Sequence, residues 1–560
     1  MSNETKRRLA LAAAFLALAT AGSRVLGLIR EMVMVSYLGL GAEMGAFTVA
    51  IKVPNLVRTL LADTALAAAF IPVFSALLEK RKEREAWQVA FSVTVTATGA
   101  LGLISVLGIL FAPEVTKVVA PGWASKYPDT LNLAVSLMRI MFPTVVIMGL
   151  AGILMGILNS YNHFAVPALA PIVWNLVIIA AVAAFSRRYG FYALAWGFTL
   201  GTLAELILQL PWVWRQRWRV TSAVSVGEPS PWRLNLRHPE VRRIAILLGP
   251  VVLSLGVINF NSFVDTVVAA LIGEAAPAYI DKAFRLFQLP QGMFAVAIGT
   301  VLFPALSRHA AAGRMQEFRR DLSLGVRQIF FVTLPLAALF SVLATPTVRL
   351  IYEHGQALGD TAAISGTAWA LLFFSVGMAF VSVNTLLSRA FYSIQKTWVP
   401  LVMGVANLAI NAGLDLLLYK PMGVGGITLS TSVVSMLTFF GLIILLRPRI
   451  GGIDARRIAV SVGKSVVALV PLAAAAYWAW WALDAVLGRS WSAGLLAVGA
   501  GYVGGGALYC IAARLLRMSE LQDLLRIIRY KRGGPELQKA PDQSPGPDHL
   551  PWPDKGGDQP

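Results

Sequence analysis

The stretch "SRVLGLIREMVM", residues 23–34, decides the fold, because it places charged side chains inside an apolar segment. "LALAAAFLALATAG" precedes it and "VSYLGL" follows it. An ionisable residue at membrane depth costs at least ~2.5–3.5 kcal/mol, and it normally faces a bundle interior or a watery cavity. Two interpretations are open: Arg24, Arg30 and Glu31 face such a cavity, or they reach an interface and the segment is not a membrane helix.

Composition favours a membrane protein, since 57% of the 560 residues are hydrophobic and only 14% are charged. A helix needs about 20 apolar residues to cross a bilayer. Apolar runs of this kind occur at 9–37, 44–78, 86–112, 130–158, 164–185, 190–214, 244–272, 279–307, 328–351, 361–387, 398–419, 424–446, 458–483 and 491–513. The sequence therefore predicts an all-α polytopic membrane protein with fourteen transmembrane helices. The single cysteine excludes an internal disulfide. The sequence contains no phosphate-binding loop of the kind that would indicate an ATPase.

The net charge of +19 would suggest a nucleic-acid partner in a soluble protein, but the positions of the basic residues give another explanation. With both termini assigned to the cytoplasm, 33 of the 48 Lys and Arg residues fall in cytoplasmic segments, 6 in external loops and 9 within helices. This asymmetry satisfies the positive-inside rule. We therefore expect both termini in the cytoplasm, membrane lipids as neighbours, and no nucleic-acid partner.

The chain also repeats itself. "AFIPVFS" (69–75) resembles "VLFPALS" (301–307), and three further matches give the same offset of 232 to 234 residues. Because the repeat contains six helices, an even number, both halves enter from the same side and form two parallel repeats. Two extra C-terminal helices have no repeat partner. The predicted organisation is a lobe at 1–214, an interfacial linker at 215–243, a lobe at 244–447, the extra helices at 448–517, a basic amphipathic helix at 518–532 and a disordered tail at 533–560.

Charged and polar side chains gather on three predicted helices. They are Arg24, Arg30 and Glu31 on helix 1; Lys52, Asn55, Arg58 and Asp63, with the helix-breaking Pro54, on helix 2; and Asp281, Lys282, Arg285 and Gln288 on helix 8. We expect the cations to converge near the axis between the repeats. Arginine forks bind phosphate bidentately, so such a cavity suits a doubly charged, phosphate-bearing substrate. The alternative is that Glu31, Asp63 or Asp281 neutralises each arginine locally.

A second polar set has a different chemistry. Its members are Asp265 on helix 7, Asn411 and Asp415 one turn apart on helix 11, and Thr431 with the Ile427 carbonyl on helix 12. Carboxylate, amide, hydroxyl and carbonyl oxygens are hard donors of the kind that Na⁺ prefers. The alternative is that these groups only satisfy one another in helix packing.

Three stretches resemble signatures of the MurJ (MviN) family, within the multidrug/oligosaccharidyl-lipid/polysaccharide exporter superfamily. They are "SRVLGLIRE", "KVPNLVRTLLADTALAAAFIPVFS" and "FRLFQLPQGMFAVAIGTVLFPALS". The resemblance covers all fourteen helices. It departs at Gly45 and Thr59, where members often carry an acidic and a basic residue, and at "ADTA", where they often show "AEGA".

The resemblance implies a lipid II flippase of peptidoglycan synthesis in the bacterial cytoplasmic (inner) membrane. It implies that Arg24, Arg30, Arg58 and Arg285, in the cavity with Lys52 and Asn55, bind the pyrophosphate of undecaprenyl-linked disaccharide-pentapeptide. It also implies a lipid-tail groove on helices 13–14 and a sodium site at Asp265, Asn411, Asp415, Ile427 and Thr431.

Three readings of function stay open at the level of sequence. Flipping breaks no bond, so we expect a transporter that is not an enzyme and requires no cofactor beyond a Na⁺ ion. A polysaccharide-lipid flippase or another exporter of the superfamily shares the pyrophosphate chemistry. A non-transporting scaffold for cell-wall enzymes would not need cavity arginines. We expect a monomer, with cell-wall synthesis enzymes as candidate partners.

Overall fold

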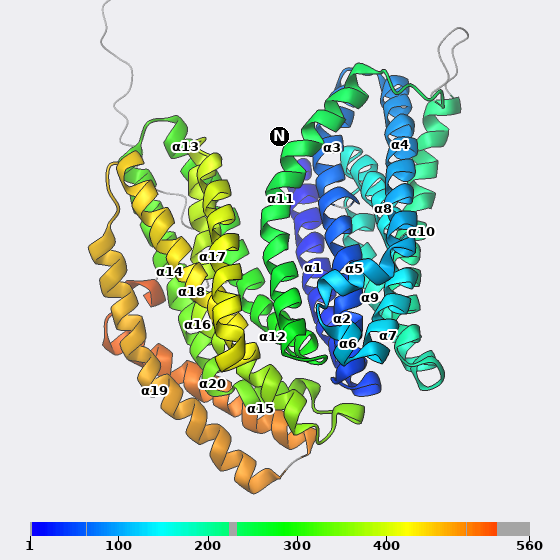
Figure 1. Cartoon of the computed structure of the whole chain (residues 1–560). Helices are drawn as coiled ribbons and strands as arrows, with labels where there is room; N and C mark the ends of the chain where they lie inside the picture. The colour runs from blue at the N-terminus through cyan, green and yellow to red at the C-terminus, as the bar shows by residue number, and fades with distance from the viewer. Residues whose placement is uncertain (1–2, 63, 223–231, 489, 523–560) are drawn as a thin grey trace, which may run out of the picture.

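The structure is a computed structural model that describes residues 3–62, 64–222, 232–488 and 490–522 (Figure 1). Every regular element in this part of the chain is a helix. Twelve stretches within it are long and apolar enough to cross a membrane. The other two predicted spans lie in α1 (Asn3–Leu38) and α11 (Pro239–Ile272), whose 36 and 34 residues extend about 54 and 51 Å. The chain is a multi-span helical membrane protein, and all fourteen predicted spans fall on helices.

In the first half, α1 is followed by nine further α-helices. They are α2 (Ala42–Val57), α3 (Thr64–Glu79), α4 (Glu83–Leu110), α5 (Ala112–Val119), α6 (Trp123–Lys126), α7 (Pro128–Met141), α8 (Pro143–Ser160), α9 (Ala165–Tyr189) and α10 (Phe191–Ser222). Thus α10 continues into the predicted linker 215–243, and α11 begins within it.

In the second half, α11 is followed by seven α-helices and then by the added pair. They are α12 (Ala276–Pro290), α13 (Val296–Ala311), α14 (Met315–Val342), α15 (Ala344–Tyr352), α16 (Thr361–Ser393), α17 (Trp398–Met422) and α18 (Val424–Leu446), then α19 (Ala455–Leu487) and α20 (Trp491–Leu515). The amphipathic helix and tail predicted after residue 517 lie almost wholly in 523–560, outside the described residues.

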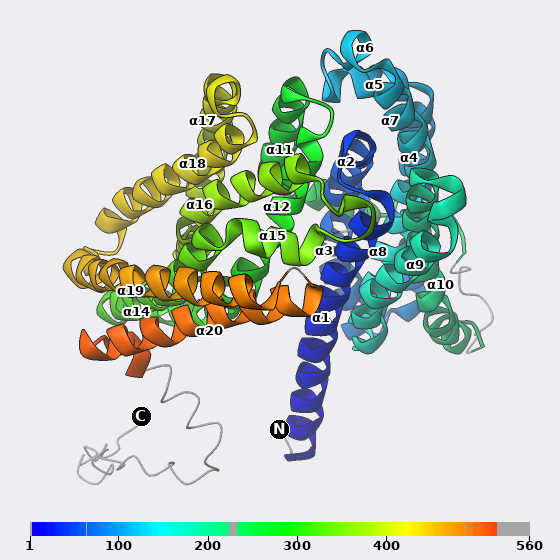
Figure 2. The ribbon, with the colours of Figure 1, turned by 90° about the horizontal axis from the view of Figure 1, so that it is seen from below.

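The helix boundaries repeat with the spacing that the sequence predicts. α9 and α17 begin 233 residues apart, α10 and α18 do the same, and α8 and α16 end 233 residues apart. Both halves enter the membrane from the same side, so the prediction of two parallel six-helix repeats with an added pair is confirmed. Figures 1 and 2 show the two lobes side by side, with α19 and α20 against the outside of the second.

Both repeats interrupt their second helix with a π-helical segment. η1 (Arg58–Ala62) follows the kinking residue Pro54, and η2 (Gln291–Ala295) follows Pro290, again with 233 residues between the two starts. A proline has no N–H for the helical ladder, and π-helical turns are frequent at functional sites. The interruption predicted around Pro54 is therefore present in both halves.

Hydropathy did not show three further breaks. The predicted spans 86–112, 130–158 and 328–351 are divided at Phe111, at Phe142 and at Leu343. Each break lies at most three residues before a proline, namely Pro113, Pro143 and Pro346. Proline is tolerated in the first turn of a new helix, and each of these prolines lies within the first three residues of the helix that follows the break.

The two lobes meet at the lower end in Figure 1 and diverge toward the upper end. Gly45 of α2 packs on the backbone of Glu274, so a Cβ there would overlap the Glu274 carbonyl. Gly355, in the turn before α16, has a φ of 57° and packs in the same way on the backbone of Ser36 in α1. These backbone contacts close the molecule at the end opposite its basic loops.

Candidate functional site

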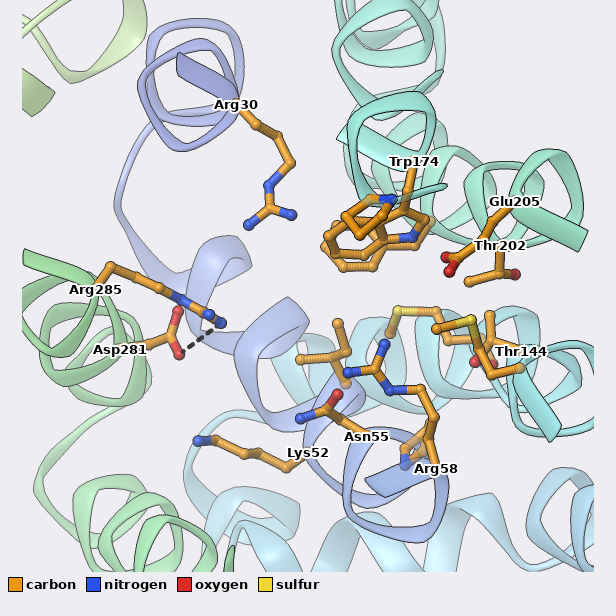
Figure 3. Close-up of a pocket in the computed structure, with 16 residues that line it drawn as sticks. Arg30, Lys52, Asn55, Arg58, Thr144, Trp174, Thr202, Glu205, Asp281 and Arg285 are labelled. Atoms are coloured by element: carbon orange, nitrogen blue, oxygen red, sulfur yellow. Dashed lines mark hydrogen bonds and ion pairs between the residues drawn. The ribbon is translucent and has the colours of Figure 1, made fainter. Parts of the chain in front are cut away.

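A cavity of about 350 Å³ lies between the lobes. Four of the predicted cations line it: Arg30 from α1, Lys52 from α2, Arg58 from η1 and Arg285 from α12, together with Asn55. Figure 3 shows the guanidinium groups of Arg30, Arg58 and Arg285 directed into the same space from three sides. The structure thus brings together five of the six residues predicted to bind substrate.

The sixth, Arg24, lines a neighbouring cavity of about 360 Å³. Arg30 and Arg285 line both cavities, so the two are adjacent. The Arg24 guanidinium lies against Gly292 of η2, where any Cβ would overlap it. α1 is continuous through this region, so both arginines reach cavities from one unbroken helix.

Arg30 is held on the first lobe by aromatic and polar contacts. Its guanidinium lies 4.7 Å from the ring centroid of Trp174 and 5.6 Å from that of Phe198. It donates to Asn175 Oδ1 at 3.1 Å and to Glu31 Oε1 at 2.5 Å. A desolvated cation over an aromatic face gains about 2 kcal/mol or more. The two rings and the two hydrogen-bond acceptors therefore hold the Arg30 guanidinium in place in a site largely shielded from water.

Glu31 joins the two lobes through a buried ion pair. Its Oε2 lies 2.5 Å from Lys282 Nζ, and the two residues are only 4% and 1% exposed. Arg285 Nε lies 3.9 Å from the other oxygen. Breaking such a pair by removing one partner leaves an uncompensated buried charge, which destabilises by roughly 3–5 kcal/mol. The pair therefore ties α1 to α12 in this conformation.

The remaining cations are paired less completely. Arg285 is 45% exposed and reaches Asp281 Oδ1 at 3.5 Å, while Lys52 Nζ donates to Ser262 Oγ at 2.8 Å. Across both cavities, five cations stand against three carboxylates, Glu31, Glu205 and Asp281. Local neutralisation is thus real for Arg30 and Arg285, yet the lining keeps a positive balance. Asp63, also considered as a partner, lies outside the described residues.

Sequence reasoning missed several residues of this region. Glu205 of α10 and Trp174 of α9 line the cavity. Lys282 was among the charged residues predicted at membrane depth, but its pairing with Glu31 across the lobes was not expected. Glu205 could have been found, since "GTLAELILQL" places a carboxylate inside an apolar span. Trp174 could not, because an aromatic residue in an apolar helix carries no signal of what it contacts.

The second predicted set forms a buried polar cluster between α11, α17 and α18. Asn411 Nδ2 donates to Asp265 Oδ1 at 2.8 Å and to Asp415 Oδ2 at 3.1 Å. Asn411 Oδ1 and Asp415 Oδ1 are buried and accept no hydrogen bond within the described residues. Two carboxylates bridged by one amide, with two oxygens left over, form a donor set that fits a small hard cation.

The other two predicted members lie on α18. Thr431 Oγ1 donates to the Ile427 carbonyl at 3.4 Å, so this pair is engaged within its own helix. Ser430, one residue earlier, lies beside the Asp415 carboxyl, and its Oγ donates to the Gly426 carbonyl at 2.9 Å within α18. Sequence reasoning missed Ser430, because serine is common in helix packing and its spacing gave no reason to prefer it to Thr431.

A sequence profile described as "Lipid II flippase MurJ" matches residues 34–499. This chain belongs to the MurJ family. The resemblance to this family is therefore confirmed, and the matched residues include the stretches on helices 2 and 8. A family member from Burkholderia cenocepacia, named "Lipid II flippase MurJ", is 30% identical over 426 residues, which are 75% of this chain and 81% of that protein. A "Probable lipid II flippase MurJ" of Rhizobium meliloti is 32% identical over 419 residues, 73% of this chain and 75% of that one.

Solved structures show the same fold. "Lipid II flippase MurJ, inward closed conformation" superposes with a TM-score of 0.72 at 22% identity, covering 90% of this chain and 99% of that one. An inward-facing multidrug resistance MATE transporter of the MOP superfamily gives a TM-score of 0.62 at 17% identity, covering 76% and 94%. The MurJ family thus shares its architecture with exporters of other cargo.

Proposed function

We propose that this chain flips lipid II from the inner to the outer leaflet of the bacterial cytoplasmic membrane. The observation that carries the proposal is the single cavity between the lobes into which Arg30 and Arg58 of one half and Arg285 of the other all project. The names of the family's relatives point to the same cargo.

The chemistry of the cavity fits a pyrophosphate diester, which carries two negative charges. Arginine forks donate paired hydrogen bonds to phosphate oxygens and keep their charge when poorly hydrated. Each cavity lies near the lower end of the ~300–1,000 Å³ range of small-molecule sites. They suit the pyrophosphate and the adjoining sugar, and the rest of the headgroup requires the lobes to move apart. Flipping exchanges contacts between the headgroup and the cavity lining and breaks no covalent bond, so the activity is transport and not catalysis.

Alternating access follows from where the lobes touch. The end at Gly45 and Gly355 is closed, so the headgroup enters from the end that carries the basic loops. The excess of Lys and Arg in those loops assigns that end, with both termini, to the cytoplasm. Export then requires the Glu31–Lys282 pair to separate, and arriving phosphate oxygens offer Lys282 a replacement partner.

The polar cluster would supply energy through a Na⁺ ion. Asp265, Asn411 and Asp415 would hold it, with Thr431 and the Ile427 carbonyl completing the set if Thr431 turns away from its own helix. A Na⁺ ion would offset one of the two buried carboxylate charges, and it would favour whichever lobe orientation binds it more tightly. The chain's own part is to hold these oxygens on three helices, so that ion binding and lobe movement are linked.

The undecaprenyl tail would remain in lipid beside the headgroup. Helices α19 and α20 present exposed apolar side chains such as Val470, Val503 and Leu515, which suit a tail groove. The chain acts as a monomer in this scheme, with cell-wall synthesis enzymes as candidate partners and no nucleic acid.

The experiment is replacement of the native flippase in a depletable bacterial strain. Lipid II in the outer leaflet is measured by its cleavage with an externally added lipid II-degrading enzyme. Expression of this chain should restore cleavage, and Arg349→Ala, a half-exposed arginine on α15 that lines neither of the two central cavities, should do so equally. If the chain reaches the membrane and lipid II stays inside while another lipid-linked sugar is exported, the cargo is different and the polysaccharide-lipid alternative is correct.

A further inference from the structure

A third basic cavity lies apart from the two already described. Its volume is about 550 Å³, and it is formed where α14, α19 and the end of α20 come together. Five cations line it: Arg327, Arg456, Arg457, Lys464 and Arg517. It shares no residue with the central cavities, and it opens on the face that carries the basic loops.

The floor of this cavity consists of polar groups that are buried and hydrogen-bonded to one another. Glu520 is 2% exposed, and it accepts from Arg327 Nη1 at 2.5 Å and from Ser461 Oγ at 2.9 Å. Lys464 Nζ donates to the Leu516 carbonyl at 2.8 Å. One carboxylate therefore lines the cavity against five cations, and it is already engaged by Arg327, whose Nε is buried without a partner in the described residues.

Two backbone features bear on the arginines of this cavity. Arg456 and Arg457 lie in the first turn of α19, where the helix macrodipole disfavours cations, and the N-cap residue Asp454 reaches Arg457 at 3.9 Å. Arg517 adopts φ 50° directly after α20, a position where helices usually place glycine. An anion in the cavity would offset the charge at the start of α19 and give the Arg517 side chain a partner.

The surroundings of the cavity are apolar. Val460 lines it and is 52% exposed, and Val467 and Val470 continue along α19 with 60% and 70% exposure. Lys464 lies between Val460 and Val467 on one helical stripe. A cationic recess that leads into an exposed apolar stripe fits an amphiphile whose head is anionic and whose chains lie along the helix.

We infer that this cavity binds the phosphate headgroup of an anionic phospholipid in the leaflet on the basic face. The bound lipid would contact α14 of the second repeat together with α19 and α20, the pair that has no repeat partner. Its phosphate would thus hold the added helices against the lobe.

The test is lipid binding by the purified full chain in nanodiscs. Binding is followed by thermal shift as phosphatidylglycerol replaces phosphatidylcholine at constant total lipid. The variant is Arg456→Gln with Arg517→Gln, two exposed arginines of the cavity rim whose loss leaves the Glu520 floor intact. The matched control is Arg242→Gln with Arg314→Gln, two exposed arginines outside every cavity described above.

The wild type and the control should be stabilised by phosphatidylglycerol, and the rim variant should need about tenfold more of it for the same shift. An equal loss in both variants would mean general charge attraction and overturn the site. A shift of the same size with inorganic phosphate alone would make the ligand a free anion and overturn the lipid assignment. No difference between the two lipids in the wild type would overturn the proposal.

Discussion

Helices α1, α9 and α10 of the first half and helices α11, α17 and α18 of the second occupy the same place in the repeat. Their packing differs, because only the first half buries a cation where these helices meet. The first holds the cation Arg30 against Trp174 and Phe198. At an offset of 233, the second half has Asn407 and Thr431 in place of these two aromatic residues. There the buried charges are the carboxyls of Asp265 and Asp415.

The same offset pairs the residues one turn further along. Asn411 and Asp415 of α17 correspond to Ile178 and Val182 of α9, all four of which are at most 1% exposed. The fold therefore accepts either an apolar or a polar cluster at this place, so packing alone does not demand the polar one. Under the proposed function, one half would supply a fixed cation for an anionic cargo, whereas the other would supply oxygens for a cation.

The largest effect should come from removing one cavity arginine in each half. Arg58→Ala and Arg285→Ala each lose a charge-assisted contact worth roughly 1.5–3 kcal/mol, so we expect flipping to fall roughly 10- to 150-fold. Lysine should restore it only partly, because it lacks the fork. Outer-leaflet lipid II in the replacement strain measures the effect, at membrane levels matched to Arg349→Ala. Full replacement by both alanine variants would show that the halves do not share one anion site.

Exchanging residues between the halves should test more selectively whether the polar cluster of α17 and the apolar packing of α9 are equivalent. Asp415→Val gives α17 the residue of α9 and should abolish Na⁺-dependent thermal stabilisation, with lipid II binding retained. The reverse change, Val182→Asp, buries a carboxyl without a partner and should destabilise the protein by roughly 3–5 kcal/mol.

Thermal unfolding in Na⁺ against K⁺, on purified protein, measures both variants. If the wild type responds equally to the two ions, the polar cluster is structural. If Val182→Asp is tolerated, the two places are not equivalent in their surroundings.

A smaller loss is expected from Gly292→Ala. The added methyl would overlap the Arg24 guanidinium, and because that group ends a flexible side chain, the arginine moves while the fold remains. We expect a several-fold lower flipping rate and an unchanged unfolding temperature. Gly27→Ala is the control, since Gly27 lines the same cavity with no atom near its missing Cβ. Equal behaviour of the two variants would remove Arg24 from the site.

The smallest effect should come from Ser430→Ala. This hydroxyl lies beside the Asp415 carboxyl and donates to the Gly426 carbonyl within α18, and the first half has Gly197 at the corresponding position. Loss of this neutral polar contact of about 0.5–1.5 kcal/mol should weaken Na⁺ binding about two- to tenfold by calorimetry. Ser435→Ala removes a hydroxyl that also donates within α18, to the Thr431 carbonyl, and should leave Na⁺ affinity unchanged. An unaltered affinity in Ser430→Ala would show that Ser430 takes no part in the ion site.

The sequence was sufficient for the spans, the repeat and the cluster of arginines, because hydropathy, charge asymmetry and offset are properties of the chain itself. It was insufficient wherever the outcome depends on a partner from another helix. The stretch "YIDKAFRLF" shows that Asp281, Lys282 and Arg285 lie at membrane depth. It does not show that Lys282 turns into the lobe interface while Arg285 faces the cavity. The breaks before Pro113, Pro143 and Pro346 were visible as prolines, but a proline does not state whether it bends a helix or restarts one.

The π-helical turns at Arg58–Ala62 and Gln291–Ala295 make the site sensitive to chain length in a way that substitutions would not reveal. Each such turn accommodates one residue more than an α-helical turn. Deleting a single residue there would let the helix close into a regular α-helix, with the faces on either side still in register, because five π-helical residues turn through about the same angle as four α-helical ones. Arg58, which lies in the turn itself, would then change its direction toward the cavity, while Lys52 and Asn55 keep theirs and the segment keeps its hydropathy and its ability to cross the membrane. A scan of one-codon deletions across 55–62 should therefore give its deepest loss of growth where protein levels are still normal.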